Sequence, residues 1–259
     1  MVIGLEKFRE YFAGFEDNYV IIGGTACDIV LRDTDMRPRA TNDIDMILVI
    51  EQMTPEFGKR FWDFIILGGY KTRQRHRGNN KPRTELFRFI HPKEGFPIQI
   101  ELLSKHPDIL GEPTGFRLMP IPIGDEISSL SAILLDEEYY NQAIESSVIE
   151  DGIRIANPLS LLCLKAKACL NLMEERETNP AIRNGDIKKH RDDVFKLLAM
   201  RIDPFMSVEL SAKMKKNIND FIDMIEESLP NQSLQDSLHR SDIEIRGYLN
   251  IMKDIFELY

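Results

Sequence analysis

Cysteine is scarce in this chain, and long apolar runs are missing. Only three cysteines occur among the 259 residues, Cys27, Cys163 and Cys169, and none belongs to a Cys-x-x-Cys pair. This number and spacing argue against a disulfide framework or a zinc site, so we expect reduced, buried thiols. No uncharged apolar run approaches the ~18 residues that a membrane-spanning helix needs. Glu6 and Lys7 interrupt the N-terminus before a signal-peptide core can form, so we expect a cytoplasmic protein without a membrane segment.

Positive charge is scarce overall but concentrated in one segment. The formal net charge is −9 at pH 7, which argues against an obligate duplex-binding protein. Residues 71–93 are the exception, because they contain eight basic residues and one acidic residue. This segment therefore carries +7 and the rest of the chain −16. Two interpretations remain open: a solvated hairpin, or a docking surface for a polyanion such as RNA.

The pattern of apolar residues along the sequence changes near residue 157. Residues 1–157 mix short apolar runs with glycines and turns, whereas residues 158–259 show helical spacing of apolar residues. We expect an α/β (α+β) fold, in which a mixed sheet with flanking helices (1–157) precedes a helical domain (158–259). Strands are predicted at 19–22, 44–50, 84–90, 96–103, 143–149 and 152–155. Helices are predicted at 6–15, 25–31, 55–67, 159–173, 186–200, around 214–225, and at 242–258.

The first candidate for chemistry is the turn Gly23-Gly24. It follows a short apolar strand and precedes a helix that Thr25 is placed to cap. Two glycines let backbone N–H groups approach a phosphate closely, and a helix N-terminus adds free donors. An ordinary tight turn explains the same pattern, so the turn is informative only in context.

The second candidate is the pair Asp43 and Asp45 at the start of an apolar strand. Strand periodicity places both carboxylates on one face, while Ile44 points to the core. Two such carboxylates repel each other unless a cation lies between them, and hard oxygen ligands suit Mg²⁺ or Mn²⁺. The similar pair Asp33 and Asp35 opens no buried strand and is interpreted as a polar loop.

The third candidate is Glu101, which alternates with apolar residues in the strand 96–103. An exposed face of an edge strand would explain it. If this strand lies beside 44–50, Glu101 joins Asp43 and Asp45, and three carboxylates could hold two metal ions about 3.5–4 Å apart. Arg88, between Phe87 and Phe89, could meet a phosphate there or form a cross-strand salt bridge.

Together these residues resemble the nucleotidyltransferase superfamily with its polymerase-β-like fold. The resemblance rests on Gly23-Gly24, on Arg39-x-Thr41-x-Asp43-Ile44-Asp45 and on Glu101 in a later strand. It implies that Asp43, Asp45 and Glu101 are catalytic and bind Mg²⁺ or Mn²⁺. It also implies that the NTP is bound by Gly23, Gly24, Thr25, Arg39 and Thr41.

The helical part resembles the AbiEii/AbiGii-type toxin branch of that superfamily. Lys165 follows Pro158 by seven residues, and Lys189 and Asp193 belong to a later Lys-x-x-x-Asp motif. His190 stands where the branch usually has aspartate, as Glu101 does at the third acid. The resemblance implies that Lys165, Lys189 and Asp193 are catalytic, that the acceptor can be RNA and that a cognate antitoxin protein is a possible partner.

The residues alone leave simpler explanations for these three helical positions. Lys165 lies among leucines and could extend outward to solvent. Lys189 and Asp193 are four residues apart and could form a surface ion pair worth about 0.3–0.5 kcal/mol. With the resemblance, Lys165 and Lys189 are interpreted as phosphate-binding or polarity-setting groups at the mouth of the cleft, and Asp193 would orient one of these lysines or bind the incoming hydroxyl.

The sequence therefore predicts metal-dependent transfer of a nucleoside monophosphate from an NTP to a hydroxyl acceptor, with RNA contacting residues 71–93. Two alternatives stay open. The same chemistry could modify a small molecule such as an aminoglycoside, which the acidic balance of the chain favours. A non-catalytic module of the same fold could bind a nucleotide or a partner, against which the intact set of three acids argues.

Overall fold

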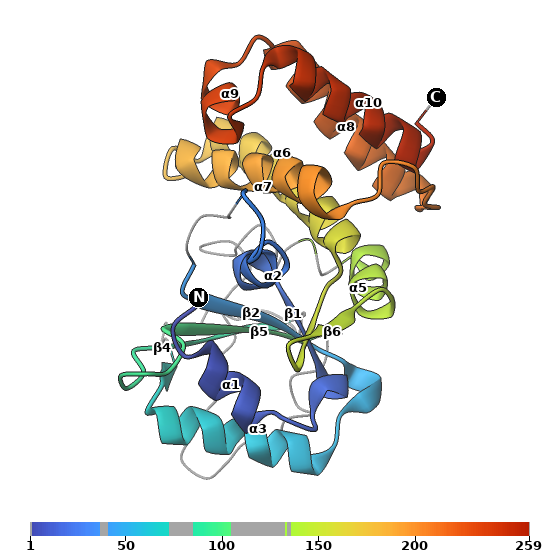
Figure 1. The fold of residues 1–259 in the computed structure, drawn as a ribbon. Helices are drawn as coiled ribbons and strands as arrows, with labels where there is room; N and C mark the ends of the chain where they lie inside the picture. Colours follow the sequence, from blue (N-terminus) through green and yellow to red (C-terminus); the bar gives the residue numbers. More distant parts are fainter. Residues whose placement is uncertain (1, 37–40, 73–84, 105–132, 134–135, 259) are drawn as a thin grey trace.

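A mixed sheet with helices on both faces forms the first part of the molecule, and helices alone form the second (Figure 1). The computed structural model describes residues 2–36, 41–72, 85–104, 133 and 136–258. The strands are β1 (Tyr19–Ile22), β2 (Asp43–Leu48), β3 (Lys71–Thr72), β4 (Glu85–Ile90), β5 (Gln99–Ser104), β6 (Val148–Glu150) and β7 (Ile153–Ile155). The helices are α1 (Leu5–Tyr11), α2 (Gly23–Val30), α3 (Pro55–Gly68), α5 (Glu137–Glu145), α6 (Pro158–Thr178), α7 (Asn184–Arg201), α8 (Ala212–Ser228), α9 (Gln232–Leu238) and α10 (Asp242–Phe256), with short 3₁₀ turns η1 (Glu16–Asn18) and η2 (Ile50–Gln52). The predicted fold class is confirmed.

The seven strands lie in the order β3-β4-β5-β2-β1-β7-β6. β4 and β5 form the antiparallel hairpin that the turn at 91–95 predicts. β5 then lies parallel to β2, and β2 lies antiparallel to β1. β2 is thus a central strand between β5 and β1, which explains why its residues 44–48 form an almost unbroken apolar run.

One face of the sheet is covered by α1 and α3 (Figure 1). Phenylalanines of both helices pack there edge to face and tilted, and Phe61 of α3 reaches Phe89 of β4. The register aligns Phe89 with Ile100 and Ile44 across β4, β5 and β2, so this row points to the aromatic core. Side chains at the alternate positions of these strands point to the opposite face.

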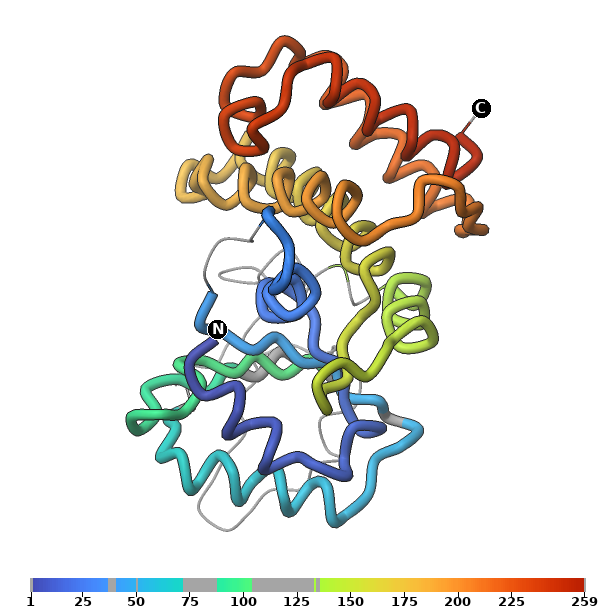
Figure 2. The backbone as a smooth tube through the Cα atoms, in the orientation of Figure 1, coloured from blue at the N-terminus to red at the C-terminus, as the bar shows by residue number. Residues whose placement is uncertain are grey.

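That opposite face is covered by α2 and α5, and α6 and α7 lie beyond α2 (Figure 2). α2 packs against both α6 and α7, which pack against each other. Asn157 caps α6 by accepting a hydrogen bond from the backbone N–H of Ser160, and Pro158 takes the first helical position as predicted. α8, α9 and α10 complete the helical part on the far side of α6 and α7.

Two local predictions are wrong. Thr25 does not cap α2, because the helix begins at Gly23; the Thr25 hydroxyl instead donates to the Asp43 carbonyl over 2.5 Å. Residues 143–149 are not one strand, since α5 runs to Glu145 and β6 begins at Val148. The division of the chain into the domains 1–157 and 158–259 stays a prediction. Across the described ranges, none of the helices combines the length and apolarity required to cross a bilayer.

Candidate active site

The three predicted carboxylates share one face of the sheet. Asp43 and Asp45 are two residues apart on β2, and the register places Glu101 of β5 directly beside Asp45. Neighbouring residues in register point to the same side of a sheet. Glu101 is therefore not on an exposed edge, and it is only 3% accessible to solvent. The alternation of β5 and its position beside β2 together bring the three acids to the face that α2 covers.

The Gly23-Gly24 turn lies against this row of acids. Gly23 has a φ of +72°, and a Cβ at this position would overlap with the Asp45 carboxylate. A Cβ at Gly24 would lie 3.0 Å from Thr41 Oγ1. The glycines thus serve the close approach of α2 to β2, and they bring Thr41, Asp43 and Asp45 next to the N-terminus of a helix.

The pKa values of all three acids are raised. Burial raises the pKa of Asp45 most, and the charges of Glu101 and Asp43 raise it further, to about 8. Burial also raises the pKa values of Glu101 and of Asp43 above their ordinary range. A cation bound beside these carboxylates would stabilise their charged forms, and groups perturbed in this way are common at functional sites.

Arg88 of β4 forms the cross-strand salt bridge that was one of its two predicted roles. Its Nε and Nη2 lie 2.8 and 2.7 Å from Glu101 Oε1. The Gln99 side chain donates to the same oxygen over 2.8 Å. Glu101 Oε2 is buried and has no hydrogen-bond partner within the described chain. Gln99 was not predicted as a site residue, although its two-residue spacing from Glu101 on one strand is a signal that could have indicated it.

The helical site residues approach the acids from above the sheet. Lys165 of α6 does not extend to solvent, because it is 1% accessible and its Nζ lies 2.7 Å from Asp193 Oδ2 of α7. Asp193 is buried too, which rules out the exposed Lys189–Asp193 pair. Lys165 and Lys189 both lie close enough to lower the pKa of Asp45. The structure therefore gathers Lys165, Lys189 and Asp193 around the carboxylate row.

His190, the position that departs from the resembled motif, lies beside these lysines. Its Nδ1 is buried without a hydrogen-bond partner among the described residues. Burial and the charges of Lys165 and Lys189 hold its pKa well below the ordinary value. A neutral imidazole consequently replaces the negative charge that an aspartate would add at this position.

The donor chemistry of the three acids fits a hard divalent cation. The row offers only oxygen donors, and Glu101 Oε2 is a buried oxygen without a partner. The arrangement is not yet a closed coordination sphere, since no three His, Cys, Asp or Glu side chains of the described residues are placed to hold one metal ion. Glu101 turns its other oxygen toward Arg88 and Gln99.

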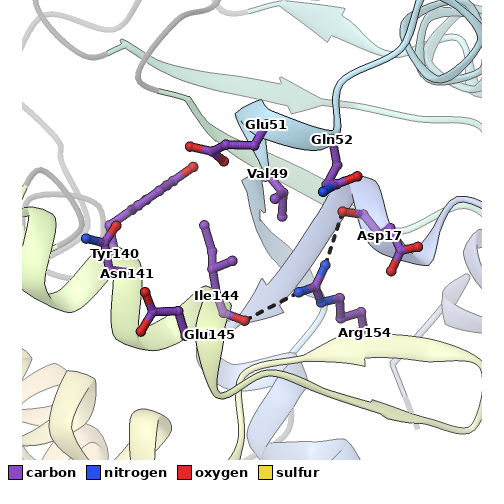
Figure 3. Close-up of a pocket in the computed structure, with 9 residues that line it drawn as sticks. All are labelled: Asp17, Val49, Glu51, Gln52, Tyr140, Asn141, Ile144, Glu145 and Arg154. Atoms are coloured by element: carbon purple, nitrogen blue, oxygen red, sulfur yellow. Dashed lines mark hydrogen bonds between the residues drawn. The ribbon is translucent and has the colours of Figure 1, made fainter.

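A pocket of about 440 Å³ lies elsewhere, at the other end of β2 (Figure 3). Its walls combine acidic groups with the Arg154 guanidinium, which donates to the carbonyls of Asp17 and Ile144. Val49, which follows β2 and lines the pocket, is four residues from Asp45, or roughly 13 Å along an extended chain. None of the nine residues that line it is a predicted site residue.

Two sets of predicted residues lie outside the described residues. Arg39, predicted to bind the NTP, is one of them. The other is most of the basic segment, namely Arg73, Arg75, Arg77, Lys81 and Arg83. Their proposed roles stay predictions.

Comparison with known proteins adds little to this geometry. No family model matches the chain, and no curated protein matches it. One solved structure, described as "putative nucleotidyltransferase from H. pylori", is similar over 99% of this chain and 96% of its own, with 12% sequence identity and a TM-score of 0.36. A likeness this distant carries no argument about activity, which must rest on the site itself.

Proposed function

We propose that the chain is a nucleotidyltransferase, which transfers a nucleoside monophosphate from an NTP to a hydroxyl acceptor. The observation that carries the proposal is the row of Asp43, Asp45 and Glu101 beside the Gly23-Gly24 turn and the N-terminus of α2. Carboxylates and the backbone N–H groups of the first turn of a helix lie next to each other there. This combination suits a metal-bound triphosphate better than either feature alone.

In this proposal the acceptor oxygen attacks the α-phosphorus and the bond to the β-phosphate breaks, so that pyrophosphate leaves. The hydroxyl proton passes to a carboxylate of the row. The backbone of Gly23 and Gly24, with Thr25, Arg39 and Thr41, would hold the triphosphate. Lys189 would offset its charge, and the Lys165–Asp193 pair would fix α6 and α7 over the site.

Asp43, Asp45 and Glu101 would hold Mg²⁺ or Mn²⁺. The bound metal would supply charge neutralisation at the triphosphate and at the departing pyrophosphate. The pKa of about 8 for Asp45, which burial raises most and the charges of Glu101 and Asp43 raise further, supports this assignment, because a cation would stabilise the charged carboxylates.

The proposed acceptor is RNA, in keeping with the resemblance to the AbiEii/AbiGii-type toxins, whose members act with antitoxins. Support comes from the +7 charge of residues 71–93 in a chain of net charge −9. The −16 carried by the remainder favours the second candidate, a cationic small acceptor. The two candidates share the same chemistry and differ in what contacts the basic segment.

The test is incorporation of each labelled NTP, with Mg²⁺ or Mn²⁺, into total RNA or into small hydroxyl acceptors. Asp45→Asn is expected to abolish incorporation and to remove most of the metal-dependent rise in melting temperature. Asp33→Asn is the matched control, because Asp33 is exposed and belongs to the other Asp-x-Asp pair. Equal metal stabilisation of the parent and of Asp45→Asn would show that these acids are not the metal site.

A triple variant identifies the acceptor in the same assay. Neutralising Arg73, Arg75 and Arg77 is expected to weaken RNA binding and to flatten its dependence on salt, while NTP binding survives. Unchanged RNA affinity and slope would turn the proposal toward a small-molecule acceptor. NTP binding without incorporation into any acceptor would instead indicate a non-catalytic module.

A further inference from the structure

The two oxygens of Glu101 have very different surroundings. Oε1 accepts from Arg88 Nε and from Gln99 Nε2, each over 2.8 Å, and Arg88 Nη2 lies 2.7 Å away. Oε2 is buried and receives no hydrogen bond from the described residues. An unpaired buried carboxylate oxygen is costly, so its persistence indicates that a further group belongs there.

Arg88 is held rigidly enough to orient this carboxylate. It faces Glu101 in the register of the β4–β5 hairpin, and Glu101 in turn faces Asp45. The side chains of Arg88 and Glu101 are 13% and 4% accessible, so water competes little for their contact. On the other face, Phe89 is anchored in the aromatic core, which fixes the strand that carries Arg88.

We propose that Arg88 is a positioning residue for metal binding, which grips Oε1 of Glu101 together with Gln99 and thereby leaves Oε2 for a divalent cation shared with Asp45. This inference rests on the proposed function, whose metal ligands it takes over. Arg88 acts through Glu101 and contacts no substrate. Groups that hydrogen-bond to a ligating carboxylate fix its direction, and their loss typically weakens metal binding 10–100-fold.

The opposite role is also conceivable from charge alone. A guanidinium that only neutralised Glu101 would compete with the cation, and its removal would tighten metal binding. The geometry favours the positioning role, because the contacts of Arg88 and Gln99 with Glu101 gather on Oε1, whereas Oε2 has no hydrogen-bond partner among the described residues. The direction of the change in metal affinity therefore separates the two roles.

The experiment measures Mn²⁺ affinity of the full chain by electron paramagnetic resonance of free Mn²⁺, without nucleotide. Arg88→Met is expected to weaken Mn²⁺ binding about 10–100-fold. Arg88→Lys keeps the positive charge but lacks the two guanidinium N–H groups that contact Glu101, so it is expected to recover part of the lost affinity. Arg32→Met is the matched control, because it removes the arginine of the Arg32–Asp151 salt bridge away from the acids. It is expected to leave Mn²⁺ affinity unchanged.

A double-variant cycle tests whether Arg88 acts through Glu101. In a Glu101→Gln background, Arg88→Met is expected to cause no further loss of Mn²⁺ affinity. Gln99→Leu provides a second route if Arg88→Met does not fold, since it removes one donor to Oε1 and should weaken binding to a lesser extent.

The failures of the inference and of the proposed function are distinguishable. A parent protein that binds Mn²⁺ while Arg88→Met binds it equally or more tightly overturns the positioning role and leaves the proposed function standing. A further loss in the Glu101→Gln background overturns it as well. A parent that binds no Mn²⁺ overturns the metal assignment of the proposed function, and the inference with it.

Discussion

Acidic side chains have different neighbours in the sheet part and in the helical part of the molecule. Between α6 and α7, Lys165 and Asp193 form a salt bridge with side chains 1% and 3% accessible. Asp192 is likewise bound by Arg191 and by the Ser237 hydroxyl. On the sheet, Asp43, Asp45 and Glu101 lie together, and their pKa values rise.

Under the proposed function, this difference separates charged groups that stabilise the fold from charged groups that bind a ligand. Burial lowers the pKa of Lys165, but the neighbouring charge of Asp193 helps to raise it overall, so the lysine stays protonated and its salt bridge holds two helices together. The crowded carboxylates are destabilising as they stand, which proteins tolerate at functional sites. In the proposed function, the helical part therefore supports the site and the sheet part carries the chemistry.

The largest expected effect comes from removing one partner of the buried salt bridge in the helical part. Lys165→Met leaves Asp193 buried without its partner and is expected to cost about 3–5 kcal/mol of unfolding free energy. Urea denaturation measures it. Lys59→Met, which removes an exposed i,i+4 pair with Asp63, should cost far less. Similar losses in the two variants would mean that burial of the pair contributes nothing.

An intermediate effect is expected from a substitution in the glycine turn beside Asp45. Gly23→Ala puts a methyl group where the Asp45 carboxylate lies, at a φ of +72°. Gly14→Ala has a similar φ of +84° but nothing within 4 Å of its Cβ, so it isolates backbone strain. We expect Gly14→Ala to cost about 1 kcal/mol and Gly23→Ala about 2 kcal/mol or more.

The metal response separates these two glycine variants further. Gly23→Ala should also lose the metal-dependent rise in melting temperature, because the displaced carboxylate can no longer meet its neighbours. Gly14→Ala should keep that rise. Thermal melts with and without Mn²⁺ measure both, and equal behaviour of the two variants would contradict the close approach of α2 to Asp45.

The smallest expected effect concerns His190, where the two parts meet. Its folded-state pKa lies well below the ordinary 6.5, so below pH 6.5 the unfolded chain binds a proton that the folded chain does not. Stability contributed by neutral His190 is therefore lost as the pH falls from 6.5 toward the folded pKa, by up to about 1.4 kcal/mol per pH unit. His190→Asn should flatten this dependence.

The measurement for His190 is urea denaturation at pH 7.5 and pH 5.5. His239→Asn is the matched control, because His239 is exposed at a position with positive φ that asparagine tolerates. The parent and this control should lose similar stability between the two pH values. If His190→Asn loses as much as they do, the acid sensitivity of the fold arises elsewhere.

The local sequence pattern was enough to predict most strands and to predict that the acids share one face of the sheet. The alternation along 43–45 and 99–101 predicts carboxylates on one face, and the register confirms that the faces coincide. The same local reasoning failed for Thr25, because the hydroxyl finds the Asp43 carbonyl, 18 residues away, instead of its own helix end. It failed for 143–149 because apolar residues of a short buried helix resemble those of a strand.

The sequence by itself determined the alternation of strands and helices, the acidic positions and the glycine turn, because these depend on side-chain period and backbone freedom over a few residues. Only the tertiary structure decided which charges are paired. Lys165 meets Asp193 across 28 residues, and Arg88 meets Glu101 through a strand pairing that also places Asp45. Packing in three dimensions brings such partners together, and their pairing matters because a buried charge without a partner strongly destabilises the fold.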